Sequence, residues 1–179
     1  MSVQSYVRLR CELTEGLERY GRWIGNPEVA PRALVRERDA IDLALADDQW
    51  RGLAVYVFDA NPWTVFEELS GGLGDRDIVS WLALAKNDDL VFAAYNDAIG
   101  YAQLIVIEGG QVVREFFHDE QDADRRINVG RLPAETGKRM ETWIDVARWV
   151  EEDERGLSRP TEGWLWIHQA PDDWPPVNS

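Results

Sequence analysis

The stretch LVFAAYNDAIGYAQLIVIEGGQVVREFF, residues 90–117, decides the fold of this chain. Its first apolar run has no polar face, which is typical of a central strand buried on both sides. Gly109 and Gly110 predict a two-residue hairpin turn, because the central positions of such a turn take a positive φ. The stretch therefore predicts a three-stranded antiparallel meander. Counting from the glycines gives the expected cross-strand pairs, Ile107 with Val112 and Ile105 with Arg114.

Further strands are predicted on both sides of the meander. Apolar and polar residues alternate over 6–13, which indicates a half-buried strand. The β-rich run 54–59 and the run 63–69 are separated by a turn at Ala60–Pro62 and predict a hairpin. Residues 163–168 predict a last strand.

Apolar spacing predicts three helices between these strands. The first is capped by Thr14, and the second is capped by Asp75 or Asp77. The third, METWIDVARWV, covers residues 140–150, and its apolar stripe is Met140, Trp143, Ile144, Ala147 and Val150.

Two segments stay outside this pattern of elements. Residues 33–48 fit the spacing of a strand and of a helix, so their structure is left open. Residues 170–179 are rich in proline and are expected to form an irregular tail. The sum is a single α+β domain over 1–179, mostly an antiparallel sheet with packed helices.

The composition combines nine tryptophans with a formal net charge of −14, from 33 acidic and 19 basic residues. Nine indoles indicate a large packed core or a binding surface. The surplus of acids repels polyanions and attracts cations or basic partners. It argues against nucleic acid, whose phosphates are bound by clustered Lys and Arg, and against an anionic membrane surface.

The cellular compartment is predicted from what the sequence lacks. No stretch approaches about 20 consecutive apolar residues, so no membrane-spanning helix is expected. The N-terminus has no uninterrupted apolar core of the kind found in signal peptides. Cys11 is the single cysteine, which excludes an intrachain disulfide. We therefore expect a cytoplasmic protein.

Motifs for catalysis and for cofactors are weak in this chain. Gly71, Gly72 and Gly74 precede a predicted helix, but aspartates follow them and no lysine accompanies them. A flexible turn with a capping aspartate explains this segment better than a phosphate-binding loop. No GxSxG nucleophile elbow is present. We expect no cofactor, and enzymatic activity is unsupported, although scattered Asp, Tyr and Arg leave it open.

No metal site is predicted from the histidines or the cysteine. His118 and His168 lie outside the HxxE and HExxH patterns of metal-binding helices. His168 shares a predicted strand face with two tryptophans, which indicates packing. Cys11 alternates with core residues and is interpreted as a small buried hydrophobe.

Arg114 and Glu115 point to opposite faces of one predicted strand, so one of the two charges must be paired or lie at a sheet edge. One interpretation is an edge strand whose charges prevent aggregation. The alternative is a ligand pocket in which Arg114 is joined by residues expected at the same end of the sheet: Tyr95, Asn96, Asp97 and Tyr101.

Two acidic clusters are the remaining candidates for a binding site. The first consists of Asp119, Glu120, Asp122 and Asp124, and the second consists of Glu151, Glu152, Asp153 and Glu154. Either the third helix ends at Val150, leaving the second cluster in solvent, or it continues with four carboxylates at the negative end of its dipole. Such a patch would steer a basic protein to the surface, and Trp149 and Trp174 are the candidate aromatic anchors.

The segments VSWLALAKNDDLVFAAYND, YAQLIVIEGGQVVREFF and WIDVARWVEEDE resemble small acidic immunity proteins of bacterial polymorphic-toxin systems, including the SMI1/KNR4-like superfamily, in their general layout. The resemblance covers the middle and C-terminal two-thirds of the chain. It implies a cytoplasmic α+β protein that binds a cognate toxin and blocks the active site of that toxin.

Three functions follow from these observations. The leading hypothesis is a non-enzymatic inhibitor of the immunity type that masks a basic toxin or effector protein. The first alternative is an enzyme or small-ligand binder that uses the Arg114 pocket. The second alternative is a structural or scaffold protein, which would show an exposed apolar patch and self-association.

Overall fold

The computed structural model describes residues 3–25, 33–47, 49–74, 76–122 and 124–168. Within these ranges, strands form a nine-stranded sheet in which every pair of neighbours is antiparallel. From one edge to the other the strands are β10 (Ile127–Gly130), β9 (Gln111–Asp119), β8 (Tyr101–Glu108), β7 (Leu90–Asn96), β1 (Val3–Leu9), β6 (Trp63–Glu68), β5 (Leu53–Ala60), β11 (Gly163–His168) and β2 (Ala33–Val35). A small second sheet pairs β3 (Leu45–Ala46) with β4 (Gln49–Trp50).

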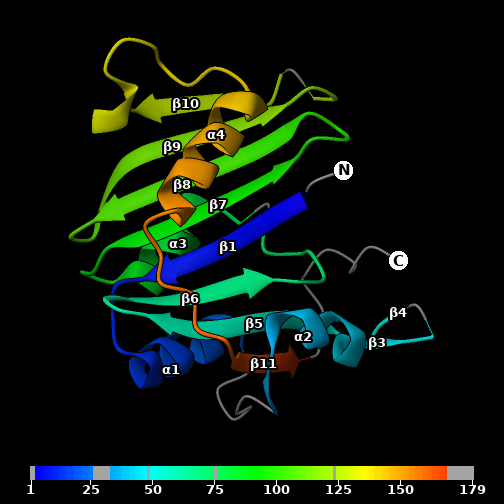
Figure 1. Ribbon diagram of the computed structural model, residues 1–179. Helices are drawn as coiled ribbons and strands as arrows, with labels where there is room; N and C mark the ends of the chain where they lie inside the picture. Colours follow the sequence, from blue (N-terminus) through cyan, green and yellow to red (C-terminus); the bar gives the residue numbers. More distant parts are fainter. Residues whose placement is uncertain (1–2, 26–32, 48, 75, 123, 169–179) are drawn as a thin grey trace.

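The sheet is covered by helices on both faces (Figure 1). One face carries α1 (Leu13–Trp23) and α3 (Ile78–Ala85), and the main core lies between them and the sheet. The other face carries α4 (Trp143–Glu154) over β7 and β8, and α2 (Glu37–Ala44) over β5 and β11. The α+β class and the antiparallel sheet predicted from the sequence are thereby confirmed.

The central position of β1 explains its burial on both faces. This strand pairs with β6 on one side and with β7 on the other, so helices lie above and below it. The predicted strand over 6–13 is too long at its C-terminal end. The chain turns after Leu9, because the amide of Arg10 bonds to the carbonyl of Asp89 and the amide of Cys11 bonds back to Leu9. Leu13 already belongs to α1.

The predicted meander is confirmed as β7, β8 and β9, but its register differs from the one counted from the turn. Ile107 lies opposite Val112 as expected, whereas Arg114 lies opposite Val106 and not opposite Ile105. A β-bulge at Val113 adds one residue to β9. Because side chains alternate between faces, the extra residue moves Arg114 to the face that carries α4.

The predicted helices are present with changed ends. Asp77 caps α3, since its side chain accepts a hydrogen bond from the Ser80 amide at 2.8 Å, and Asp75 lies outside the described residues. The N-cap of α1 is Glu12 and not Thr14. The open segment 33–48 contains β2, α2 and β3, within its described residues.

The third predicted helix, α4, begins at Trp143 and continues to Glu154, so its second acidic cluster is helical. Its buried stripe is Val146 and Val150, and Ile144, expected on that stripe, is 49% exposed. No helix in the described ranges is both long enough and apolar enough to cross a membrane.

Candidate functional site

A groove of about 580 Å³ lies on the α4 face, at the end of the sheet where β7 begins and β8 ends. Its walls come from four elements that are distant in sequence: β6, the β7–β8 pair, the segment after β10, and α4. The apolar lining includes Trp63, Val91, Val106, Leu132, Pro133 and Trp149, and the polar rim is Arg10, Asp89 and Glu108. We call this hollow the tryptophan groove.

A strand positions one indole of the tryptophan groove and a helix positions the other. Trp63 is the first residue of β6 and shares the α4 face with Val65, two residues later. Trp149 lies on α4 beside the buried stripe formed by Val146 and Val150, so it packs at the margin of the core under this helix. Both side chains are half-buried. Each indole therefore offers a large apolar surface that is still accessible from solvent.

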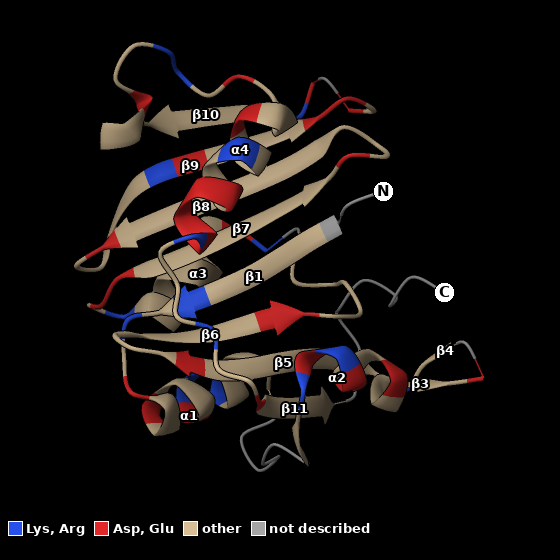
Figure 2. Ribbon diagram, in the orientation of Figure 1, with Lys and Arg blue, Asp and Glu red and all other residues tan. Residues whose placement is uncertain are grey.

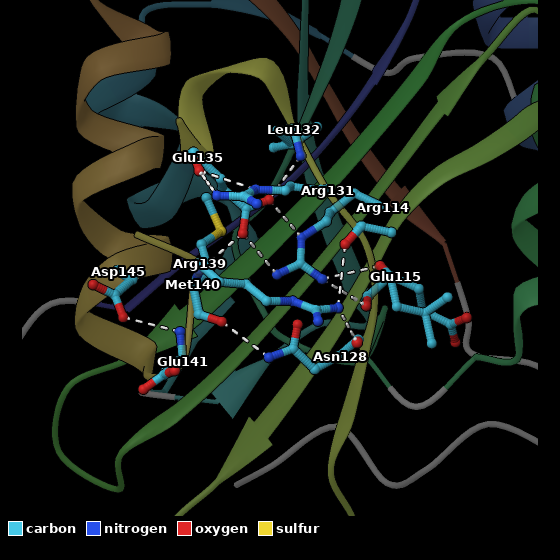
Figure 3. A network of polar contacts seen from close by, with 12 residues as sticks. Arg114, Glu115, Asn128, Arg131, Leu132, Glu135, Arg139, Met140, Glu141 and Asp145 are labelled. Carbon is cyan, nitrogen blue, oxygen red and sulfur yellow. Dashed lines mark hydrogen bonds and ion pairs between the residues drawn. The ribbon is translucent and has the colours of Figure 1, made fainter. Parts of the chain in front are cut away.

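A buried ion pair holds the wall of the groove that contains Leu132 and Pro133 (Figure 3). The Arg114 side chain is fully buried, and its Nε lies 2.9 Å from Oε2 of Glu135. One Nη donates to the other oxygen of Glu135 at 3.1 Å, and the second Nη donates to the carbonyl of Val129 at 2.9 Å. This pairing connects β9 to the short 3₁₀ turn at Pro133–Glu135.

The carboxylate of Glu135 also accepts two backbone hydrogen bonds. The amide of Leu132 donates at 2.7 Å and the amide of Met140 at 2.8 Å. Burial on its own would raise the pKa of Glu135, but these two amides and the Arg114 guanidinium outweigh it and lower the pKa below its usual value. Glu135 is therefore ionised at neutral pH and fixes both ends of the segment 132–140.

A second polar network anchors the C-terminal end of α4 to the centre of the sheet. Arg8, on β1, forms an ion pair with Asp153 and donates to the hydroxyl of Tyr6 at 2.8 Å. Arg159, in the segment that runs from α4 across the sheet towards β11 (Figure 1), lies 3.7 Å from Glu154. It also pairs with Glu67 on β6.

These two arginines explain why α4 tolerates acids in its last turn. Carboxylates near a helix C-terminus are unfavourable by about 0.3–1 kcal/mol each. Asp153 faces Arg8 and Glu154 faces Arg159, so the positive partners come from the tertiary structure and not from the helix itself. Asp153 and Glu154, predicted as partner-binding residues, are thus engaged within the protein.

Of the other acids in the two clusters, Glu120 lies beside the N-terminal end of α4, and Glu151 and Glu152 belong to its C-terminal half. Glu120 lies in the turn after β9 and accepts a hydrogen bond from the indole of Trp143 at 3.2 Å. Glu151 and Glu152 are exposed near the other end of the helix, about 12 Å from Trp143 at 1.5 Å per residue. Asp122 and Asp124 are exposed, and Asp119 accepts a hydrogen bond from the amide of Gln121 at 2.8 Å. Trp174 lies outside the described residues.

The surface around α4 is acidic but not uniformly so. Figure 2 shows acids on its last turns and at the ends of neighbouring strands, with basic residues between them. Arg148 is exposed on the helix, and Lys138 pairs with Asp145 at 3.2 Å. The bases interrupt the acidic surface at the middle of the helix.

The structure brings four of the five alternative pocket residues to the β7–β8 turn and leaves Arg114 outside this group. Asn96 and Tyr101 pair across the β7–β8 turn, and Asp97 lies in that turn. Arg114 lies opposite Val106, five positions from Tyr101 along β8, or about 17 Å at 3.4 Å per residue. Tyr95, next to Asn96 on β7, is buried. β9 is also not an edge strand, because β10 pairs with it.

The histidines and the cysteine are placed as follows. Among the described residues, no group of three or more His, Cys, Asp and Glu side chains is arranged to hold a metal ion. His168 is buried against Tyr20 and Trp166, and desolvation lowers its pKa to about 4. His118 stacks on Phe116 within β9. Cys11 is half-buried, and burial raises the pKa of its thiol.

Sequence reasoning missed Trp63, Arg8 and Glu135. Trp63 was assigned only to a hairpin, and nothing in the local pattern links it to Trp149. The sequence contains one signal for Arg8. A charged residue in a strand that is central in its sheet needs a partner, because both faces of such a strand are buried. Glu135 lies in a polar loop without a periodic pattern.

Comparison with known protein families, with curated proteins and with solved structures found no match for this chain.

Proposed function

We propose that this protein is a non-enzymatic binding protein of the immunity type, which acts in the cytoplasm and masks a basic toxin or effector protein with its α4 face. The observation that carries the proposal is the juxtaposition of Trp149, half-buried in the tryptophan groove, with exposed carboxylates at both ends of the same helix. Aromatic anchors beside charged residues are a common composition of protein interfaces.

The charge of the chain favours a basic partner. A net charge of −14 creates a negative field that speeds the approach of a positively charged protein. Glu120 near Trp143 and Glu151 near Trp149 lie within the width of an ordinary interface. A toxin whose cleft normally binds phosphates would present complementary charge.

The burial of the tryptophans supports a binding role as well as a core role. Trp81 and Trp166 are fully buried, whereas the other tryptophans that the structure describes are half-buried. Trp63, Trp143 and Trp149 gather on the α4 face. The small-ligand alternative is weakened, because Arg114 is committed to Glu135 and lies far from Tyr101.

The test is purification of the tagged full-length protein from its native host, followed by identification of the bound protein and measurement of its association rate. We expect one basic protein whose association rate falls steeply as salt rises. Neutralising the exposed acids in the variant D122N/D124N/E151Q/E152Q should slow association about tenfold or more at low salt.

The matched control is E18Q/D42N/D47N/E162Q, which neutralises the same number of exposed acids on other elements than α4. It should leave the association rate within about twofold of the unchanged protein. An acidic partner, or a rate that is insensitive to salt and to the α4 acids, would overturn the proposal.

A further inference from the structure

We infer that the tryptophan groove binds an apolar side chain of the partner that is flanked in sequence by Lys or Arg. This inference rests on the proposed function and specifies its contact chemistry. Trp63 and Trp149 line one hollow with Val91 and Leu132, and its volume of about 580 Å³ accommodates an aromatic or aliphatic side chain.

The carboxylates beside the groove select for flanking positive charge. Asp89 and Glu108 belong to its rim, and a second hollow of about 370 Å³ shares Arg10 with it. That second hollow adds four acids: Glu12, Glu15, Asp59 and Asp88. A side chain inserted into the groove therefore carries its neighbours onto an acidic rim.

The basic residues beside the two hollows neutralise only part of the negative charge of these carboxylates. Arg10 pairs with Asp89 at 2.9 Å. Arg19 is buried, and it pairs with Asp88 at 2.6 Å and with Glu15 at 3.4 Å. Lys86 ends α3 nearby. Among the described residues, the two hollows are lined by six carboxylates and by one base, Arg10, so even with Arg19 counted the lining keeps a negative surplus that a basic segment complements.

The groove is formed before any partner binds. The Arg114–Glu135 pair holds the wall that contains Leu132 and Pro133. Arg8 and Asp153 hold the C-terminal end of α4, about one turn beyond Trp149. A preformed site loses little conformational entropy on binding, which favours affinity from a few contacts.

A second copy of this chain fits the groove poorly. It would bring its own surplus of acids against Asp89 and Glu108, and like charges across an interface are unfavourable. The occupant to which the charges point is therefore a basic protein segment with an apolar residue at its centre.

The experiment titrates the ¹⁵N-labelled full-length protein with three capped peptides: acetyl-Arg-Phe-Arg-amide, acetyl-Glu-Phe-Glu-amide and acetyl-Arg-Ser-Arg-amide. The readout is the chemical shift of the indole N–H signals. We expect the Arg-Phe-Arg peptide to shift the signals of Trp63 and Trp149, with a dissociation constant on the order of 1 mM. The other two peptides should bind about tenfold more weakly or not at all.

Two pairs of variants separate the groove from the rest of the surface. Trp149→Ser should weaken the Arg-Phe-Arg peptide about tenfold, whereas Trp143→Ser, on the same helix and also half-buried, should leave it unchanged. Glu108→Lys, at the exposed end of β8, should weaken the peptide about threefold without disturbing the core, and the control is Asp42→Lys on α2.

Three results would each overturn the inference: equal shifts with the Glu-Phe-Glu peptide, equal effects of Trp143→Ser and Trp149→Ser, or indole N–H signals that do not shift when the Arg-Phe-Arg peptide is added. Concentration-dependent shifts without peptide would show self-association and also overturn it. If the indole signals do not shift with the peptide while a basic partner still associates in a salt-dependent way, the groove inference fails and the proposed function stands. If the peptide binds but the host yields no basic partner, the proposed function fails instead.

Discussion

Replacing Arg114 with methionine should destabilise the protein strongly, because the variant leaves the carboxylate of Glu135 buried without its cation. Arg114 is 0% exposed and Glu135 is 3% exposed, so water cannot replace the lost partner without opening the fold. Removing one member of a buried pair costs about 3–5 kcal/mol. In a domain of this size, that loss lowers the melting temperature by about 6–20 °C.

The assay is urea unfolding followed by circular dichroism, with Arg148→Met as the matched control. Arg148 lies on the surface of α4, 3.8 Å from Asp145, and an exposed pair of this kind contributes less than about 1 kcal/mol. The double variant R114M/E135Q should be less destabilised than the sum of its single variants, by about 0.5–3 kcal/mol, because the two groups are coupled.

A loss of stability in Arg114→Met that equals the loss in Arg148→Met would refute this reasoning. It would mean that Glu135 finds a proton or water in place of the guanidinium, and that the segment 132–140 does not depend on the pair. The groove inference would then lose its argument from a preformed wall.

Three further predictions concern individual elements. Burial raises the pKa of both Glu67 and Glu68 from 4.5 to about 7, so between these pH values the folded state holds protons that the unfolded state has released. These two groups should therefore make stability fall as pH rises from about 4.5 to about 7, and Glu68→Gln should reduce this fall in urea unfolding, since the contribution of His168 is the same in both proteins; an unchanged pH profile would contradict the burial of Glu68. Gly110→Ala should cost about 1 kcal/mol more than Gly109→Ala in thermal unfolding, because both glycines have positive φ but only at Gly110 would the new Cβ meet a backbone oxygen, that of Lys86 at 2.6 Å; equal costs would contradict the structure. Asp77→Ala should remove the cap of α3 and cost about 1 kcal/mol, with Asp77→Asn restoring most of the loss.

The order of the sheet was beyond prediction from the sequence. The pattern of β1 indicates a strand but not its neighbours, and its partners β6 and β7 lie more than 50 residues further along the chain. Its insertion between them is decided by the burial of Val7 against Phe66 and Phe92, which only the assembled core provides.

The sequence by itself determined the elements whose cause is local. Gly109 and Gly110 require the turn between β8 and β9, Asp77 caps the helix that follows it, and the apolar run of β7 must be buried on both faces. Such features depend on a few adjacent residues, so they can be predicted from the order of the residues along the chain.

Only the tertiary structure decided the face and the partner of each important charge. The bulge at Val113 turns Arg114 towards α4, where it meets Glu135, 21 residues later. The tryptophan groove joins Trp63 to Trp149 across the sheet. A charge or an indole becomes part of a site through neighbours that are distant in sequence, because desolvation and charge pairing act through space and not along the chain.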